Sequence, residues 1–101
     1  MKYVVLFEDA PTAPSDLRRK HMAAHLAFLE AHADQVEAAG PLADPERQGR
    51  DGLWIVEAAS VAAVDALIKA DPFWPTGLRH TYSVIPWTQV FASGKRVLTA
   101  D

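Results

Sequence analysis

The chain has 101 residues, half of them apolar or aromatic, and its 13 acidic and 10 basic residues leave a formal net charge of −3. This length allows one domain with a single core, and the composition is not that of a disordered chain. The one basic cluster, Arg18-Arg19-Lys20, is too short for a surface that follows nucleic-acid phosphates, so we expect no nucleic-acid partner. The absence of cysteine excludes disulfides, a thiol nucleophile and Cys-ligated metal centres.

The N-terminal segment predicts a strand followed by a helix. Residues 3–7 are β-branched or aromatic and apolar on both alternating faces, which is typical of a strand buried on both sides. Because this short stretch runs into Glu8-Asp9, it is not a signal peptide, and we expect a cytoplasmic protein with no membrane partner. Prolines in 10–14 end the strand, and Ser15 or Asp16 can cap a helix that continues to about Ala33.

This helix predicts an inward face rich in histidine. At about 100° per residue, one third of its circumference collects three histidines among apolar residues. The residues of this face are Leu17, His21, His25, Phe28, Leu29 and His32. An imidazole on a core-facing stripe needs a hydrogen-bond partner, and such exceptions to local rules collect at functional sites.

The middle of the chain predicts two more strands and a second helix. A strand from Val36 to Leu42 contains Gly40-Pro41, which suggests a bulge or an early exit. After a polar surface loop over 44–52, residues 53–56 form the next strand. Ser60 can cap a helix over residues 61–70.

The end of the chain predicts one more strand. Asp71-Pro72 stops the second helix, because the residue before proline avoids helical conformation. An aromatic connection over 73–78 leads into a strand from Thr81 to Phe91, in which Pro86 marks an edge or a bulge. We expect one domain over residues 1–92 and a loose polar tail over 93–101.

The order βαββαβ predicts an α+β fold, with both helices on one face of a four-stranded antiparallel sheet. The other face has no helix to cover it, yet Val4, Leu6 and their counterparts on neighbouring strands make it apolar. Stable monomers rarely leave such a patch to water, so we expect a homodimer that packs through this bare sheet face. The alternative is that loops or the C-terminal tail cover it.

His25 and Asp71 are the candidate catalytic residues. An imidazole titrates near neutral pH when unperturbed, so His25 is the best general base in the chain. A carboxylate bonded to one ring nitrogen would fix the tautomer and stabilise the imidazolium, and the end of the second helix can bring Asp71 to the first. The alternative is a histidine bonded to a backbone carbonyl and an aspartate that merely starts an Asp-Pro turn.

A metal site is a weaker hypothesis. His21 and His25 are spaced i,i+4 and could offer two nitrogens to one metal, with His32, Asp71 or His80 as a third ligand. No dedicated metal motif supports such a site, and we assign neither a metal nor any other cofactor.

Several residues are candidates for binding a small-molecule substrate. Phe73 and Trp74 follow Asp71 in a proline-bounded loop and could wall a site built around it. Arg79 could bind a substrate carboxylate as a bidentate fork, and a solvated surface arginine is an equally good interpretation. His80 and His21 complete the set. No GxGxxG, Walker A or GxSxG motif is present.

Five segments in this order resemble the YciI-like (YCII-related) family. They are Met1-Lys2-Tyr3-Val4-Val5-Leu6-Phe7, Met22-Ala23-Ala24-His25-Leu26-Ala27-Phe28-Leu29, Ala39-Gly40-Pro41-Leu42, Ala70-Asp71-Pro72-Phe73 and Val84-Ile85-Pro86-Trp87. The resemblance implies a ferredoxin-like dimeric α+β barrel with an active site at His25 and Asp71. The chain departs from the commonest pattern at Trp74-Pro75 and at Arg79-His80, which bears on the substrate more than on the fold.

One branch of the family is similar to dehydrochlorinases of chlorinated aromatic breakdown products, and the fold is similar to that of muconolactone isomerases. We therefore expect a cofactor-independent lyase or isomerase in which His25 abstracts a proton from a small acidic, lactone or aromatic-breakdown metabolite and Asp71 orients it. The alternatives are a binding module that holds such a metabolite without transforming it and, less favoured, the histidine metal site.

Overall fold

The computed structural model describes residues 1–43, 46 and 50–97. Its main elements follow the predicted βαββαβ order, and the strands form one antiparallel sheet in the order β2-β3-β1-β4. The elements are β1 (Lys2–Asp9), α1 (Leu17–Ala31), β2 (Val36–Pro41), β3 (Gly52–Glu57), α2 (Val61–Ala70) and β4 (Arg79–Trp87). The predicted α+β fold is confirmed.

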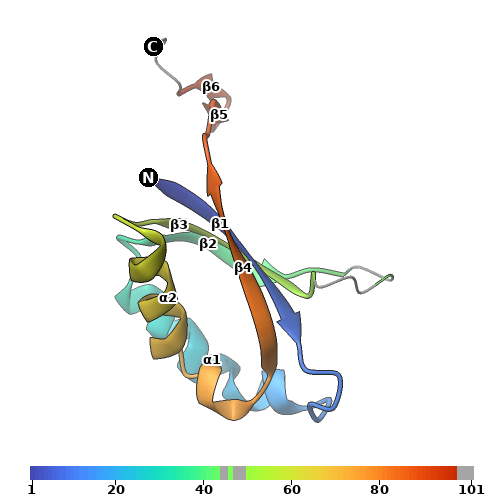
Figure 1. Ribbon diagram of the computed structural model, residues 1–101. Helices are drawn as coiled ribbons and strands as arrows, with labels where there is room; N and C mark the ends of the chain where they lie inside the picture. Colours follow the sequence, from blue (N-terminus) through green and yellow to red (C-terminus); the bar gives the residue numbers. More distant parts are fainter. Residues whose placement is uncertain (44–45, 47–49, 98–101) are drawn as a thin grey trace.

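The core lies between the sheet and the two helices, which cover the same sheet face (Figure 1). Val5 of β1 pairs with Trp54 of β3 and Val84 of β4, so these side chains share the helix-covered face. Val64 and Ile68 of α2 are fully buried against this face. Their i,i+4 spacing explains why this sequence forms a helix that docks by one side.

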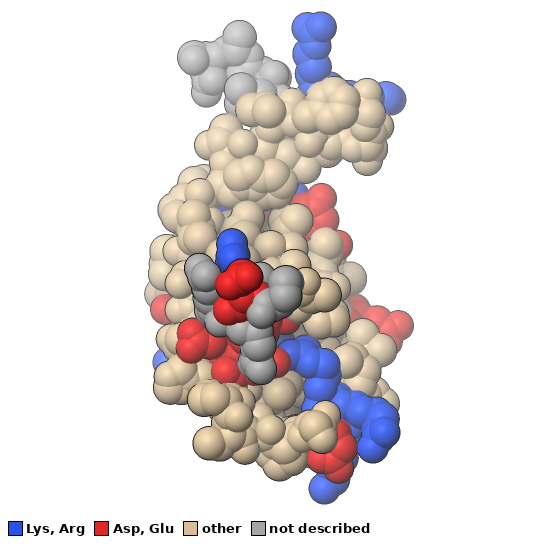
Figure 2. All heavy atoms as spheres, turned by 90° about the vertical axis from the view of Figure 1, so that its right-hand side faces the viewer, with Lys and Arg blue, Asp and Glu red and all other residues tan. Residues whose placement is uncertain are grey.

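The opposite sheet face carries apolar side chains that the single chain leaves partly open. Val4 pairs with Ile55 and Ile85, and Leu6 lies two residues along the same strand. Ile85 is 44% exposed. Figure 2, turned by 90° from Figure 1, shows few charged side chains on the upper part of the molecule's visible face. The prediction that β1 is buried on both sides is therefore wrong within one chain.

The two helices begin differently. Ser60 has extended backbone dihedrals, and its hydroxyl accepts a hydrogen bond from the backbone N–H of Ala63 at 3.1 Å, so the predicted cap is confirmed. Asp16 precedes α1 but makes no side-chain cap, because its own backbone is already helical. The predicted cap at Asp16 is wrong.

Strand irregularities differ from the predicted ones. The register shift in β2 lies between Val36 and Ala38 and not at Gly40-Pro41. A second shift, between Glu8 and Asp9 at the end of β1, places Asp9 opposite Arg79. Because of this pairing, β4 begins at Arg79, two residues before the predicted start, and the strand fixes the backbone of that arginine.

The predicted loose tail from residue 93 is wrong as far as Arg96. Strand β5 (Phe91–Ala92) pairs with β6 (Lys95–Arg96) in a hairpin that extends beyond the end of the sheet (Figure 1). Ser93 and Gly94 both have positive φ, as a tight hairpin turn requires. Residues 98–101 of that tail and part of the predicted loop over 44–52 lie outside the described residues. No helix in the described ranges is long and apolar enough to cross a membrane.

Candidate active site

His25 and Asp71 meet beneath the sheet. His25 is the buried residue of α1, with 6% of its surface exposed, and Asp71 is the fully buried residue that follows α2. Nδ1 of His25 lies 2.9 Å from Oδ1 of Asp71. The predicted contact between these two side chains, 46 positions apart, is therefore present.

The Asp71 carboxylate accepts three hydrogen bonds. Besides the His25 ring, the backbone N–H of Phe73 donates to Oδ1 at 3.0 Å, and the Arg79 guanidinium donates to Oδ2 at 2.7 Å. Burial alone would raise the pKa of Asp71. The hydrogen bonds from His25 and Phe73 and the charge of Arg79 outweigh burial, so the net pKa shift is downward and the carboxylate is ionised at neutral pH.

Arg79 compensates the buried charge of Asp71. Its side chain is 4% exposed, and its guanidinium carbon lies 3.9 Å from the centroid of the Phe7 ring, as in a cation–π contact. Burial lowers the pKa of Arg79, while the charge of Asp71 acts in the opposite direction. The residue predicted to bind a substrate carboxylate is thus bonded to a carboxylate of its own chain.

These contacts determine which nitrogen of His25 can act as a base. An ionised carboxylate only accepts hydrogen bonds, so Nδ1 must carry the proton, and the neutral ring then has a free lone pair on Nε2. Phe73 stacks on the ring at 4.1 Å between centroids, and Trp54 lies at 6.3 Å. Within the described part of the chain, no hydrogen bond to Nε2 is present.

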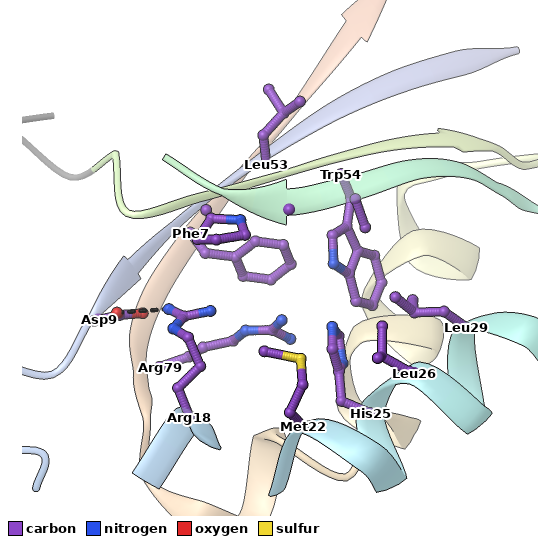
Figure 3. Close-up of a pocket in the computed structure, with 14 residues that line it drawn as sticks. Phe7, Asp9, Arg18, Met22, His25, Leu26, Leu29, Leu53, Trp54 and Arg79 are labelled. Atoms are coloured by element: carbon purple, nitrogen blue, oxygen red, sulfur yellow. Dashed lines mark hydrogen bonds and ion pairs between the residues drawn. The ribbon is translucent and has the colours of Figure 1, made fainter. Parts of the chain in front are cut away.

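A pocket of about 100 Å³ opens beside His25, between α1 and the ends of β2 and β3 (Figure 3). Aromatic rings from the sheet and aliphatic side chains from α1 form most of its wall, and two arginines enter it. The lining includes Phe7, Arg18, Met22, His25, Trp54 and Arg79. A dry cavity of about 150 Å³ holds benzene, so this smaller pocket encloses only part of a ring, and the rest of a one-ring ligand would extend into the opening.

The other predicted substrate-binding residues do not line this pocket. Phe73 is buried behind the imidazole, and Trp74 packs edge-on against Tyr82, with 5.6 Å between the ring centroids. His80 is exposed and His21 is half-buried. None of these four residues is part of the pocket wall.

The sequence analysis missed Arg18 and Met22 as pocket residues. Their signal was present, because Arg18, Met22 and His25 follow one helix face at spacings of four and three. The sequence analysis treats Arg18 only as part of a basic cluster.

The described residues offer no set of ligands for the metal-site hypothesis. Across residues 1–43, 46 and 50–97, no three His, Cys, Asp or Glu side chains gather closely enough to hold a metal ion.

Comparison with known proteins identifies a family. The family model described as YCII-related domain matches residues 1–88. The chain is also similar to the structure of 5-chloro-2-hydroxyhydroquinone dehydrochlorinase (TftG) from Burkholderia phenoliruptrix in complex with 2,5-dihydroxybenzoquinone. The two share 28% sequence identity and a TM-score of 0.69, over 87% of this chain and 94% of that one.

A second structure supports the fold alone. It is a dimeric protein of unknown function with a ferredoxin-like fold from Bacteroides fragilis, 14% identical, with a TM-score of 0.50 over 83% of this chain and 90% of that one. The ferredoxin-like architecture is confirmed. No curated protein matches the chain.

Proposed function

The chain belongs to the YCII-related domain family, and on this premise we propose that it is a small enzyme of the lyase or isomerase type. In this proposal, Nε2 of His25 abstracts a proton from a carbon atom of a small acidic, lactone or aromatic-breakdown metabolite. Asp71 and Arg79 are positioning residues that act through the imidazole. This chemistry needs no cofactor, and the cytoplasm remains the predicted location.

The observation that carries the proposal is the 2.9 Å contact between Nδ1 and Asp71 at a ring that also lines the pocket. A base must present an unprotonated nitrogen to its substrate, and the contact with Asp71 gives Nε2 that role. When Nε2 takes the proton, the imidazolium faces an ionised carboxylate that stabilises it. In an elimination, the electron pair left on the carbon expels the leaving group as an anion, and His25 releases the proton to solvent. In an isomerisation, the electron pair shifts a double bond, and His25 returns the proton to another carbon of the same molecule.

The pocket supports a planar, largely apolar substrate. Phe7 and Trp54 supply aromatic walls, and the pocket together with its opening suits about one ring. The similar dehydrochlorinase acts on a chlorinated hydroxyhydroquinone, and a dihydroxybenzoquinone is bound in its complex. Loss of HCl from a ring of this kind requires that a hydroxyl proton is removed and that the ring tautomerises before chloride leaves, and in this proposal His25 carries out these proton transfers.

The test is a panel of chlorinated hydroquinones and unsaturated lactones, assayed for chloride release and for isomerisation. We expect turnover of at least one compound, and His25→Gln should lower kcat by about 10²–10⁴-fold. The matched control is His32→Gln, the same substitution at the C-terminal end of the helix and outside the pocket lining. A folded His25→Gln protein with full activity would refute the proposal. A panel compound bound but recovered intact would favour the binding-module alternative.

We also propose that a second copy of the chain covers the bare sheet face. Val4, Leu6, Ile55 and Ile85 give this face an apolar surface, and no helix of the described residues lies over it. Two-fold association would bury the same patch on both chains.

A further inference from the structure

We propose that Arg18 binds an anionic oxygen of the substrate, so that the pocket selects small planar anions such as aromatic carboxylates or ionised hydroxyquinones. This inference rests on the proposed function, because it concerns the same pocket. It assigns to the site a residue that the active-site proposal does not use.

Two guanidinium groups line the pocket, and only one is available to a ligand. Arg79 is almost completely buried, is bonded to Asp71 and lies over the Phe7 ring. Moving it to a ligand would leave the Asp71 carboxylate buried without its counter-charge, which is strongly unfavourable. Arg79 is therefore not available to bind a ligand.

Arg18 has hydrogen-bond donors that its contact with Asp9 does not use. Its side chain is 27% exposed, and one of its terminal nitrogens donates to Oδ2 of Asp9 at 2.7 Å. A guanidinium carries five N–H donors, and a bidentate pair with a carboxylate would use two of them. Here the other oxygen of Asp9 is buried and has no hydrogen-bond partner among the described residues, so the pair with Arg18 is held through one oxygen.

Figure 3 shows the guanidinium of Arg18 at the side of the pocket below Phe7 and joined to Asp9, with the guanidinium of Arg79 between it and His25 in this view. The Arg18 guanidinium also lies 5.9 Å from the centroid of the Phe73 ring, which stacks on His25. Arg18 and His25 are thus neighbours of the same aromatic ring and walls of the same pocket.

The helix sets the separation between the two functional groups. Arg18 and His25 are seven residues apart, which is two turns and roughly 10 Å along the axis. In this proposal, a ligand of one ring places an anionic oxygen at Arg18 and the proton to be removed at Nε2 of His25.

Asp9 competes with the ligand for the same guanidinium. An anion offers Arg18 a second charged acceptor, whereas a neutral ligand of the same shape cannot replace the contact with Asp9. The expected selectivity is therefore between charged and neutral forms of one shape. Hydrogen bonds to a charged group are worth about 1.5–3 kcal/mol, which corresponds to about a 10- to 150-fold difference in affinity.

The test measures calorimetric binding of benzoate and of benzamide, its neutral isostere. Wild-type protein should bind benzoate at least tenfold more tightly than benzamide, and Arg18→Gln should lower the benzoate affinity to that of benzamide. Arg19→Gln, the same change at the adjacent exposed residue, is the matched control and should bind as wild type does. Asp9→Asn, which removes the competing charge, should bind benzoate as tightly as wild type or more tightly.

Benzoate binding that is unchanged in Arg18→Gln would overturn the inference, and so would weaker binding by Asp9→Asn. Neither result touches the proposed function, which depends on the activity of His25→Gln. Conversely, a His25→Gln protein that remains active would refute the proposed function while benzoate binding still tests Arg18.

Discussion

Replacing Asp71 by asparagine removes a negative charge at the point where an imidazole, a backbone N–H and a guanidinium converge. The substitution conserves shape, so packing changes little. What changes is that Arg79, 4% exposed, loses its counter-charge while its guanidinium remains buried among aromatic rings. The asparagine amide can also turn an N–H toward the donors of Arg79 or His25, which would leave a second unsatisfied contact.

The size of the effect follows from this burial. Breaking a buried ion pair by removing one partner costs about 3–5 kcal/mol, because the remaining charge is uncompensated. A domain of this length is stable by only about 5–15 kcal/mol, so the loss is a large fraction of the total. It corresponds to a decrease in melting temperature on the order of 10–40 °C.

Urea denaturation of Asp71→Asn, followed by circular dichroism, measures this loss. Asp65→Asn is the matched control, since Asp65 lies on α2, accepts a hydrogen bond from Tyr82 at 2.9 Å and, within the described part of the chain, has no buried cation bonded to it. The Asp65→Asn substitution should lower the free energy of unfolding by about 0.5–1.5 kcal/mol. The double variant Asp71→Asn/Arg79→Met, without either charge, should recover part of the stability. Equal losses for Asp71→Asn and Asp65→Asn would refute the idea that Asp71 balances a buried guanidinium.

Two further predictions concern the pH dependence of stability and the oligomeric state. Since the folded-state pKa of Asp71 is lowered, its contribution to stability is present above the unfolded value of about 3.9 and is lost as the pH falls through the folded value. Wild-type urea midpoints should thus fall more steeply below about pH 4 than those of Asp71→Asn, and parallel curves would contradict this. Ile85→Arg should convert a dimer into monomers in sedimentation, whereas Val61→Arg, at an equally exposed position on α2, should not. A dimer that survives Ile85→Arg would place the interface elsewhere.

The parts of the fold that follow a local pattern could be predicted from the sequence. The bounds of α2 follow from the cap at Ser60, the apolar spacing of Val64 and Ile68, and the stop at Asp71-Pro72. The hairpin at the C-terminal end was missed because short β-strands have weak patterns. Its turn residues, Ser93-Gly94, were nevertheless a usable signal.

The site could be predicted only in part. His25 and Asp71 were found because each breaks a local rule, and the topology allowed them to meet. The part played by Arg79 could not be derived, because it depends on the register shift at Glu8/Asp9, which brings the start of β4 under Phe7. Such a shift depends on how two strands pair and not on the pattern within either one.

The sequence leaves two interpretations of Asp71 open: an aspartate that starts a turn, or a partner of His25. In the structure, the same carboxylate does both. Oδ1 accepts from the backbone N–H of Phe73, two residues ahead, and from the imidazole. The turn therefore orients the carboxylate by local contacts and directs it at the position that His25 occupies. A negative charge beside the carbonyls that end α2 is unfavourable on its own, and Arg79 is the group that offsets it. The guanidinium thus allows a turn residue to remain ionised in the interior, where it can hold the proton of Nδ1 and leave Nε2 free.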